Sequence, residues 1–281
     1  MEFGVAIFPT AEAMAPADLG VALEDRGFES LWVAEHTHIP ASRRSPWPGG
    51  PELPQMYYET MDPFIWLTAA AAATMDLKIG TGICLVVERD PIVTAKEVAS
   101  IDQLSHGRFL FGIGGGWNAE EMENHGTEFA GRWKLVRERI EAMKAIWAND
   151  PAEYHGEVVD FDPIFSKPKP WQTPHPPIHV GGAAPWGPRR AARYGNGWMP
   201  IYGRGSMIDE LDVLAAECEK HDRDPAEIAL SLYNAPADLD VAQRHAEAGI
   251  DRFVFGLPPA GADTVLPLLD RLSTIITAVN G

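Results

Sequence analysis

Short apolar runs and segments with helical periodicity alternate along the whole chain. The apolar runs predict eight strands, and each is followed by a segment whose apolar positions recur every three to four residues. The predicted strands are 3–8, 30–35, 77–85, 108–114, 177–182, 197–202, 228–233 and 251–256. The predicted helices are 11–26, 61–75, 91–105, 118–148, 185–194, 206–221, 237–248 and 262–279. Eight such pairs fit a closed (β/α)8 TIM barrel, with an open doubly wound sheet as the alternative.

Two proline-rich stretches interrupt this alternation. The first, residues 36–58, follows the second strand and is expected to form a lid. The second, residues 153–177, precedes the fifth strand; it should open as a short hairpin that turns at Gly156. With 281 residues, of which 46% are hydrophobic, the chain is expected to be a single α/β domain over residues 1–281 with these two insertions.

The charge balance narrows the class of partner. The chain has 23 basic and 40 acidic side chains, and the resulting net charge of -17 disfavours nucleic acid and anionic membranes and favours a small-molecule ligand. The two cysteines, Cys84 and Cys218, lie in a strand-like and a helix-like run, so a disulfide framework is not expected. This favours a protein of the reducing cytoplasm. The first residues read as a strand rather than an export signal, so a soluble cytoplasmic protein is expected.

A glycine run follows the fourth predicted strand, in the stretch RFLFGIGGGWNAEE from Arg108 to Glu121. A Rossmann fingerprint that starts at Gly112 would need glycine where Trp117 stands, and no lysine follows to make a Walker loop. What remains is a turn that can present backbone N–H groups to an anion. A second such cluster follows the fifth strand, the neighbour in a barrel, so the two turns together predict a phosphate cradle; the alternative is that they serve only as turns. The cradle residues are Gly114, Gly115, Gly116, Gly181, Gly182 and Ala183.

Candidate catalytic residues are expected at the carboxyl ends of the strands, where TIM barrels place their sites. The second strand delivers Glu35 and His36; a histidine there could pass a proton near neutral pH, or could simply bond a backbone carbonyl. The pair His36 and His38 also raises a zinc site, but the later strands supply no further ligands, so no metal is expected. Gly82 predicts a bulge in the third strand, where a flat ligand could press against the backbone.

Four motifs together resemble the bacterial luciferase-like monooxygenase superfamily, and most closely its coenzyme F420-dependent oxidoreductases: WVAEHTHIP, LSHGRFLFGIGGGW, PHPPIHVGG and RAARYGNGW. The resemblance implies a (β/α)8 barrel that holds a flavin or deazaflavin in its carboxyl-terminal mouth. It also implies that the ring packs on a non-proline cis peptide at Gly82–Ile83, beside the Glu35–His36 pair. Gly114, Gly115 and Gly116 would then run past the phosphate arm, with Gly181, Gly182 and Ala183 opposite.

The chain also departs from the family pattern. The superfamily's sugar-phosphate dehydrogenases have a glutamate directly after the glycine loop, where this chain has Trp117, and their phosphate-binding lysines have no match, so an activated sugar is not expected. Trp117 and the other aromatic residues expected nearby favour a flat or apolar organic substrate. The alternative is that these aromatic residues belong to the hydrophobic core. The other residues are Trp47, Tyr57, Tyr58 and Trp198. Candidates for binding the anionic tail of the cofactor are Arg43, Arg44, Arg189, Arg190 and Arg204.

Three functions remain open at this stage. The first is an F420-dependent oxidoreductase that moves a hydride between the deazaflavin and a small organic substrate, with His36 assisting and Glu35 as the partner of His36. The second is an FMN-dependent monooxygenase that uses O2. The third is a flavin- or deazaflavin-binding protein without catalysis. Related barrels often form homodimers through helices that flank the early strands, so the resemblance makes a homodimer an expectation for this chain as well.

Overall fold

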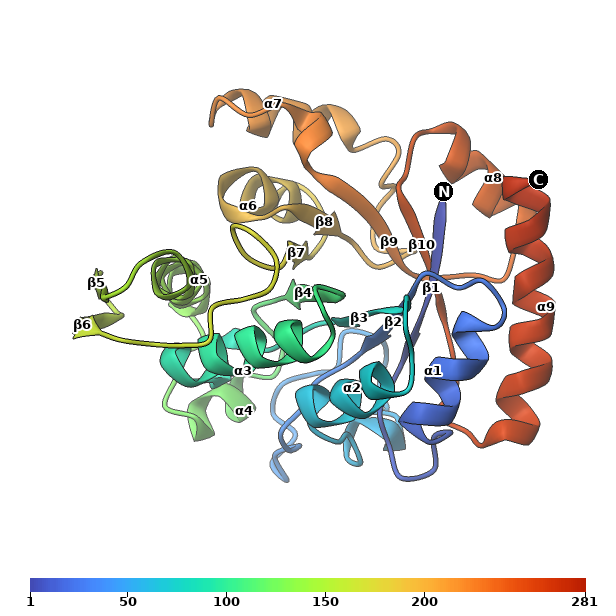
Figure 1. The fold of residues 1–281 in the computed structure, drawn as a ribbon, viewed down its shortest axis with the longest axis horizontal. Helices are drawn as coiled ribbons and strands as arrows, with labels where there is room; N and C mark the ends of the chain where they lie inside the picture. Colours follow the sequence, from blue (N-terminus) through green and yellow to red (C-terminus); the bar gives the residue numbers. More distant parts are fainter.

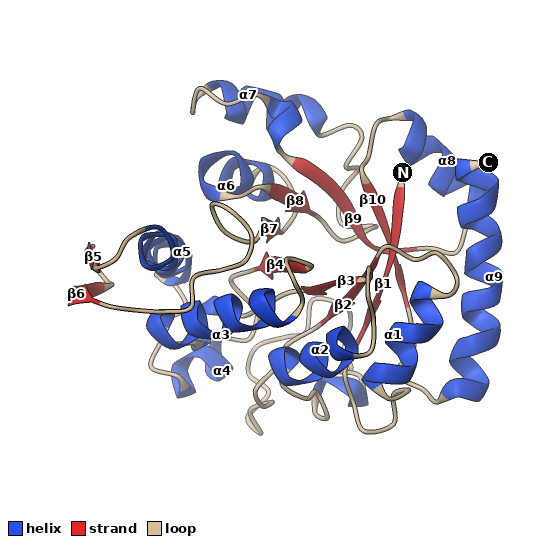
Figure 2. Ribbon diagram, viewed as in Figure 1, coloured by secondary structure: helices blue, strands red, loops and turns tan.

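The computed structural model describes residues 1–281 and shows a closed barrel of eight parallel strands. The strands follow one another around the barrel in the order β1-β10-β9-β8-β7-β4-β3-β2, and every neighbouring pair is parallel. Figure 2 shows these strands at the centre, surrounded by helices. The predicted TIM barrel is therefore confirmed, and the open sheet is excluded. The barrel strands are β1 (Glu2–Ile7), β2 (Ser30–Val33), β3 (Lys78–Thr81), β4 (Phe109–Ile113), β7 (Ile178–Gly181), β8 (Gly197–Met199), β9 (Ala229–Ala235) and β10 (Arg252–Gly256).

The helices pack outside the barrel (Figure 1). They are α1 (Pro16–Glu24), α2 (Pro63–Ala72), α3 (Pro91–Leu104), α4 (Ala119–Asn124), α5 (Arg132–Ala148), α6 (Trp186–Tyr194), α7 (Leu211–Glu219), α8 (Leu239–Glu247) and α9 (Ala262–Asn280). Asp-Pro pairs begin α2 and α3: Asp62 and Asp90 accept hydrogen bonds from the first free backbone N–H groups, while the proline needs none. No helix is long and apolar enough to cross a membrane.

Several predicted boundaries were wrong. The helix predicted over 118–148 is two helices, α4 and α5, because the chain turns at Gly126, which has φ of +77°. The strand predicted over 77–85 ends at Thr81, and a short turn of 3-10 helix follows at Val86–Glu88. The helices predicted to start at 11 and 206 start at 16 and 211.

Both insertions lie where they were expected. Residues 36–58 follow β2 and contain a single 3-10 turn, Gln55–Tyr57. The second insertion opens as an antiparallel hairpin of β5 (Ala152–His155) and β6 (Asp160–Ile164), closed by the bond from Gly156 N to Val159 O. Figure 1 places this hairpin beside α5, at the edge of the molecule. The first insertion, and not the hairpin, therefore contributes to the barrel mouth.

Inward and outward side chains of the strands form separate cores. A small cluster fills the barrel interior, and a much larger one lies between the barrel and its helices. The interior cluster comprises Ala6, Trp32, Leu110, Met199 and Val254. Trp198, predicted near the mouth, instead belongs to the outer core, and its Nε1 donates to the Gly182 carbonyl over 2.8 Å. His179 is buried in β7, as expected for a packed histidine, and burial lowers its pKa to about 3.

Candidate active site

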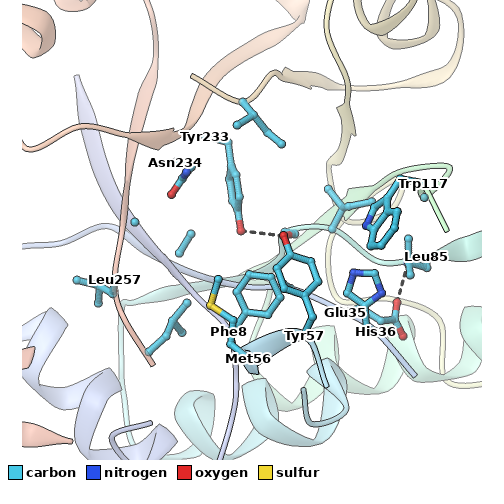
Figure 3. Close-up of a pocket in the computed structure, with 18 of the residues that line it drawn as sticks. Phe8, Glu35, His36, Met56, Tyr57, Leu85, Trp117, Tyr233, Asn234 and Leu257 are labelled. Atoms are coloured by element: carbon cyan, nitrogen blue, oxygen red, sulfur yellow. Dashed lines mark hydrogen bonds between the residues drawn. The ribbon is translucent and has the colours of Figure 1, made fainter. Parts of the chain in front are cut away.

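Two adjoining cavities open at the carboxyl ends of the barrel strands. The first, about 420 Å³, contains His36 and is called the His36 cavity below (Figure 3). The second, about 290 Å³, is lined by both glycine turns and is called the glycine cavity. The two share much of their lining, so they form one continuous cleft. The shared residues are Trp47, Tyr57, Gly82, Ile83, Gly116, Trp117, Ile201 and Tyr233.

The two glycine turns lie side by side because β4 and β7 are hydrogen-bonded neighbours in the barrel. Gly114 to Trp117 from the first turn, and Gly181 and Gly182 from the second, line the glycine cavity. The backbone N–H groups of Gly115, Gly116 and Gly182 donate no hydrogen bond within the protein. Ala183, which was also predicted, follows directly but does not line the cavity. Unpaired N–H groups on two adjacent turns can bind an anion.

Close packing explains why the first turn is rich in glycine. A Cβ on Gly114 would lie 2.1 Å from Ile83 Cδ1, so a larger residue there would force the Ile83 side chain to move. The second turn is held differently, by the hydrogen bond from Trp198 to Gly182. Both turns are therefore fixed by their surroundings, and their free N–H groups have set positions.

The predicted irregularity after β3 is present, and Gly82–Ile83 is a non-proline cis peptide. The Gly82 amide donates to Val33 O over 2.7 Å, and its carbonyl accepts from the Tyr233 hydroxyl over 2.7 Å. Figure 3 shows this second bond beside the cavity. The segment thus joins the ends of β2 and β9 at the cavity wall.

The His36 ring is held by Glu121 on α4. His36 Nδ1 lies 2.8 Å from Glu121 Oε2, and the side chains are only 7% and 1% exposed. An ionised carboxylate can only accept, so Nδ1 carries the hydrogen and Nε2 is free of any bond within the protein. The other Glu121 oxygen accepts from the Thr37 amide over 3.1 Å. His36 can therefore offer one nitrogen to a ligand in the cavity.

Glu35 is not the partner of His36, contrary to the sequence prediction. Its carboxylate accepts from the Leu85 amide over 2.6 Å, as Figure 3 shows, and from Arg89 Nε over 2.7 Å. Arg89 also pairs with Asp62 and Glu97. Glu35 therefore ties the end of β2 to the segment before α3, while a residue 85 positions further along the chain holds the histidine. The sequence offered no signal for Glu121 beyond its place just after the glycine run.

A buried carboxyl, Glu88, lies close enough to Glu121 and Glu35 to feel the charge of both. Neither of its oxygens has a hydrogen-bond partner, and His125 Nε2 is 3.8 Å away. Burial, together with the negative charges of Glu121 and Glu35, raises the pKa of Glu88 to about 9. Glu88 is therefore neutral at pH 7 and adds no negative charge beside Glu121 and Glu35.

The lid is anchored to α4 through Glu120. Its carboxylate accepts from the Ser45 hydroxyl and from the backbone N–H groups of Arg44 and Ser45. Although burial alone would raise it, these bonds hold the pKa of Glu120 at about 2. They place Trp47 over both cavities, where it meets Tyr57 with ring centroids 5.6 Å apart.

Only some of the predicted arginines and aromatic residues line the cleft. Arg204 lines the glycine cavity. Arg190 lies just behind it, with Cζ 3.4 Å from the ring centre of Trp133, which also lines that cavity. Arg43 lies over Trp117, whereas Arg44 pairs with Glu123 and Arg189 lies over Trp186, both away from the cleft. Trp47, Tyr57 and Trp117 line the cleft, but Tyr58 does not.

An eight-stranded parallel barrel with a cleft at the carboxyl ends of its strands defines a (β/α)8 enzyme. Residues 1–266 match the family described as luciferase-like monooxygenase, and the chain belongs to this family of oxidoreductases.

Individual relatives agree with the family. A Mycobacterium tuberculosis protein described as uncharacterized is 37% identical over 286 residues, which cover 97% of this chain and 98% of the relative. An F420-dependent glucose-6-phosphate dehydrogenase from Amycolatopsis mediterranei is 28% identical over 213 residues, 71% of this chain and 57% of that one. An FMNH2-dependent dimethylsulfone monooxygenase from Pseudomonas putida is 32% identical over 155 residues, 53% and 42% of the two chains.

A comparison with solved structures finds the same fold. The structure of an F420-dependent secondary alcohol dehydrogenase matches with a TM-score of 0.78 at 19% identity, over 100% of both chains.

Proposed function

We propose that the chain is an F420-dependent oxidoreductase that moves a hydride between the deazaflavin and an uncharged organic substrate. The observation that carries the proposal is the continuous cleft. One half presents unpaired N–H groups from two neighbouring turns, and the other half is largely apolar and contains His36. Such a cleft suits a ligand with an anionic arm and a flat ring, next to a separate organic substrate.

The residues present fit this cofactor. Gly115, Gly116 and Gly182 would hold the anionic arm through their N–H groups, and Arg204 would supply a local positive charge within a chain of net charge -17. The bound deazaflavin would supply or accept the hydride. His36 would hold a proton at Nε2 for a substrate oxygen, and Glu121 would stabilise the charged ring. Tyr57, Trp117 and Leu257 would keep water away from the reacting carbon.

Similarity to the F420-dependent glucose-6-phosphate dehydrogenase supports the cofactor, but the cavity does not suit a sugar phosphate. Trp117 stands directly after the glycine run and lines both cavities. The rest of the His36 cavity is mostly apolar, and it contains no lysine or arginine. A phosphorylated sugar would therefore lose its hydration there without gaining a cationic partner.

The second candidate is an FMN-dependent monooxygenase that uses O2. It is favoured by similarity to the FMNH2-dependent dimethylsulfone monooxygenase. The same N–H groups would hold the single phosphate of FMN, and the same apolar cavity would shield the reaction from water. The two candidates therefore differ in the cofactor and in the need for oxygen, and both can be measured.

The experiment titrates the purified protein with F420 and, separately, with FMN, and follows absorbance and fluorescence. We expect F420 to bind at micromolar concentration and FMN more weakly. Arg204→Ala should weaken F420 binding about tenfold, which corresponds to about 1.4 kcal/mol. Arg189→Ala is the matched control, because that side chain lies over Trp186 and outside the cleft, and it should leave binding unchanged.

Turnover then separates the three functions. Under anaerobic conditions, a panel of apolar secondary alcohols should bleach the absorbance of the bound, oxidised F420. Tight binding of FMN without binding of F420, and product formation only with O2, would establish the monooxygenase instead. A third result would be cofactor binding with no turnover in either direction: alcohols do not bleach the oxidised cofactor, and ketones do not restore the absorbance of the reduced cofactor. That result would indicate a protein that binds the cofactor without catalysis.

A further inference from the structure

Asn234 occupies an irregular position at the end of β9. Between Phe253 and Phe255 of β10 there is one residue, but the partners Leu232 and Ala235 on β9 are separated by two, Tyr233 and Asn234. One extra residue on one strand is a β-bulge. In a regular strand, consecutive side chains point to opposite faces. Because of the bulge, Tyr233 and Asn234 both line the His36 cavity.

Two further features make room for the Asn234 amide. Asn234 has φ of +56°, in the left-handed region that few residues other than glycine and asparagine adopt. Across the bulge, a Cβ on Gly256 would lie 2.2 Å from Asn234 Oδ1, so a side chain there would displace the amide from its present position. The bulge, the left-handed backbone and the missing side chain at 256 together let this amide reach the cavity wall.

The amide has no partner within the protein. Asn234 is exposed at the mouth of the cavity, and its side chain forms no hydrogen bond with another residue. It lies across the cavity from His36, because β9 and β2 are separated by β10 and β1 around the barrel. Figure 3 shows the two side chains at opposite sides, with Phe8, Met56 and Tyr57 between them. The cavity thus has a polar group at each end and mostly apolar side chains between them.

We propose that Asn234 is a specificity-determining residue whose amide binds a hydrogen-bonding group at the end of the substrate remote from the carbon that reacts beside His36. This inference rests on the proposed function for the position of the reacting carbon. Since an amide can both donate and accept, the remote group is a hydroxyl or a carbonyl. It is uncharged, because the cavity wall contains no lysine or arginine to pair with an anion, and its one carboxylate, Glu35, is already paired with Arg89. The substrate class is therefore an apolar molecule with two separated oxygen functions.

The test compares ketones that differ only in a remote hydroxyl: cyclohexanone with 4-hydroxycyclohexanone, and 4-phenylcyclohexanone with 4-(4-hydroxyphenyl)cyclohexanone. Dissociation constants are measured by calorimetry on the protein with oxidised F420 bound, and again without cofactor. In at least one pair, the hydroxylated ketone should bind the native protein about tenfold more tightly, as expected for one well-formed hydrogen bond.

Asn234→Gly is the key variant, because glycine adopts a φ of +56° without strain and removes only the amide. It should abolish the preference for the hydroxylated ketone and leave the affinity for the plain ketone unchanged. Gly256→Ala should also abolish the preference, because the added methyl group displaces the amide, and it provides a second route if the first variant folds poorly. His36→Ala should weaken both members of a pair by the same factor.

Equal affinity for both ketones of each pair would overturn the inference, as would a preference that survives in Asn234→Gly and Gly256→Ala. Failure of all four ketones to bind would overturn it as well. A preference that depends on Asn234 but is accompanied by no effect of His36→Ala on either ketone would support the role of Asn234 and contradict the proposed function instead.

Discussion

The His36 ring is oriented by the Glu121 carboxylate, 2.8 Å from Nδ1. Because the carboxylate can only accept, it fixes which ring nitrogen carries hydrogen and leaves Nε2 for the substrate. Its charge also stabilises the ring when a second proton arrives. Glu121 is therefore a positioning residue, and its effect should appear in catalysis rather than in binding.

Substitution of Glu121 tests this role. Glu121→Gln can keep the hydrogen bond but loses the charge, so we expect kcat to fall about tenfold; Glu121→Ala should lower it about a hundredfold. KM should change little in either variant, whereas general damage to the site would change both constants. Glu123→Gln, on the same helix and bonded only to Arg44, is the control and should match the native enzyme. Equal losses in both glutamine variants would contradict the assignment.

Glu88 predicts how stability depends on pH. Its pKa is about 9 in the folded protein, against 4.5 as the ordinary value expected on unfolding. Between these values the folded state holds a proton that the unfolded state has released, so this contribution to stability is complete below pH 4.5 and is lost as pH rises to 9. Glu88→Gln cannot titrate. Its Tm should therefore fall less between pH 6 and pH 9 than the native Tm, as measured by calorimetry; equal falls would show that Glu88 titrates normally.

The position of the lid, residues 36–58, is held by a few hydrogen bonds to α4. The Ser45 hydroxyl donates to Glu120 and accepts from the Ala119 amide, so one side chain joins the lid to the helix that also carries Glu121. Movement of the lid would carry Trp47 and Tyr57 away from the two cavities, which both residues line. The lid and the histidine are therefore held by the same helix.

Ser45→Ala should loosen the lid. It removes two hydrogen bonds of about 1 kcal/mol each, so we expect amide exchange in residues 41–54 to become at least tenfold faster, as measured by hydrogen–deuterium exchange. Exchange in β4 and β7 should not change. Ser273→Ala, which loses only a bond to its own helix on the exposed face of α9, is the control. Unchanged exchange in the lid would show that Glu120 alone holds it.

The sequence predicted all eight barrel strands because strand and helix periodicities differ clearly over such lengths. It predicted the ends less well. The segment 118–148 has a helical pattern throughout, but the left-handed Gly126 ends α4, and one glycine within a helical pattern was not enough to predict that break. The β9 bulge was also missed, because an extra residue is defined only by its pairing with β10.

At the scale of the whole molecule, the barrel closure is what made much of the site predictable. Once eight parallel strands were expected, their carboxyl ends had to meet, and the glycine turns after β4 and β7 had to be neighbours. Partners of side chains did not follow from this. Glu121 and Asn234 are set by a short helix and a bulge, and Glu35 points to Arg89 rather than to His36.

The most direct test of the proposed binding mode is a crystal structure of the protein soaked with F420. We expect density for the cofactor's anionic arm within hydrogen-bond distance of the N–H groups of Gly115, Gly116 and Gly182, and density for the ring beside His36. Density for the arm elsewhere on the molecule, with both glycine turns making no contact with the bound cofactor, would contradict it.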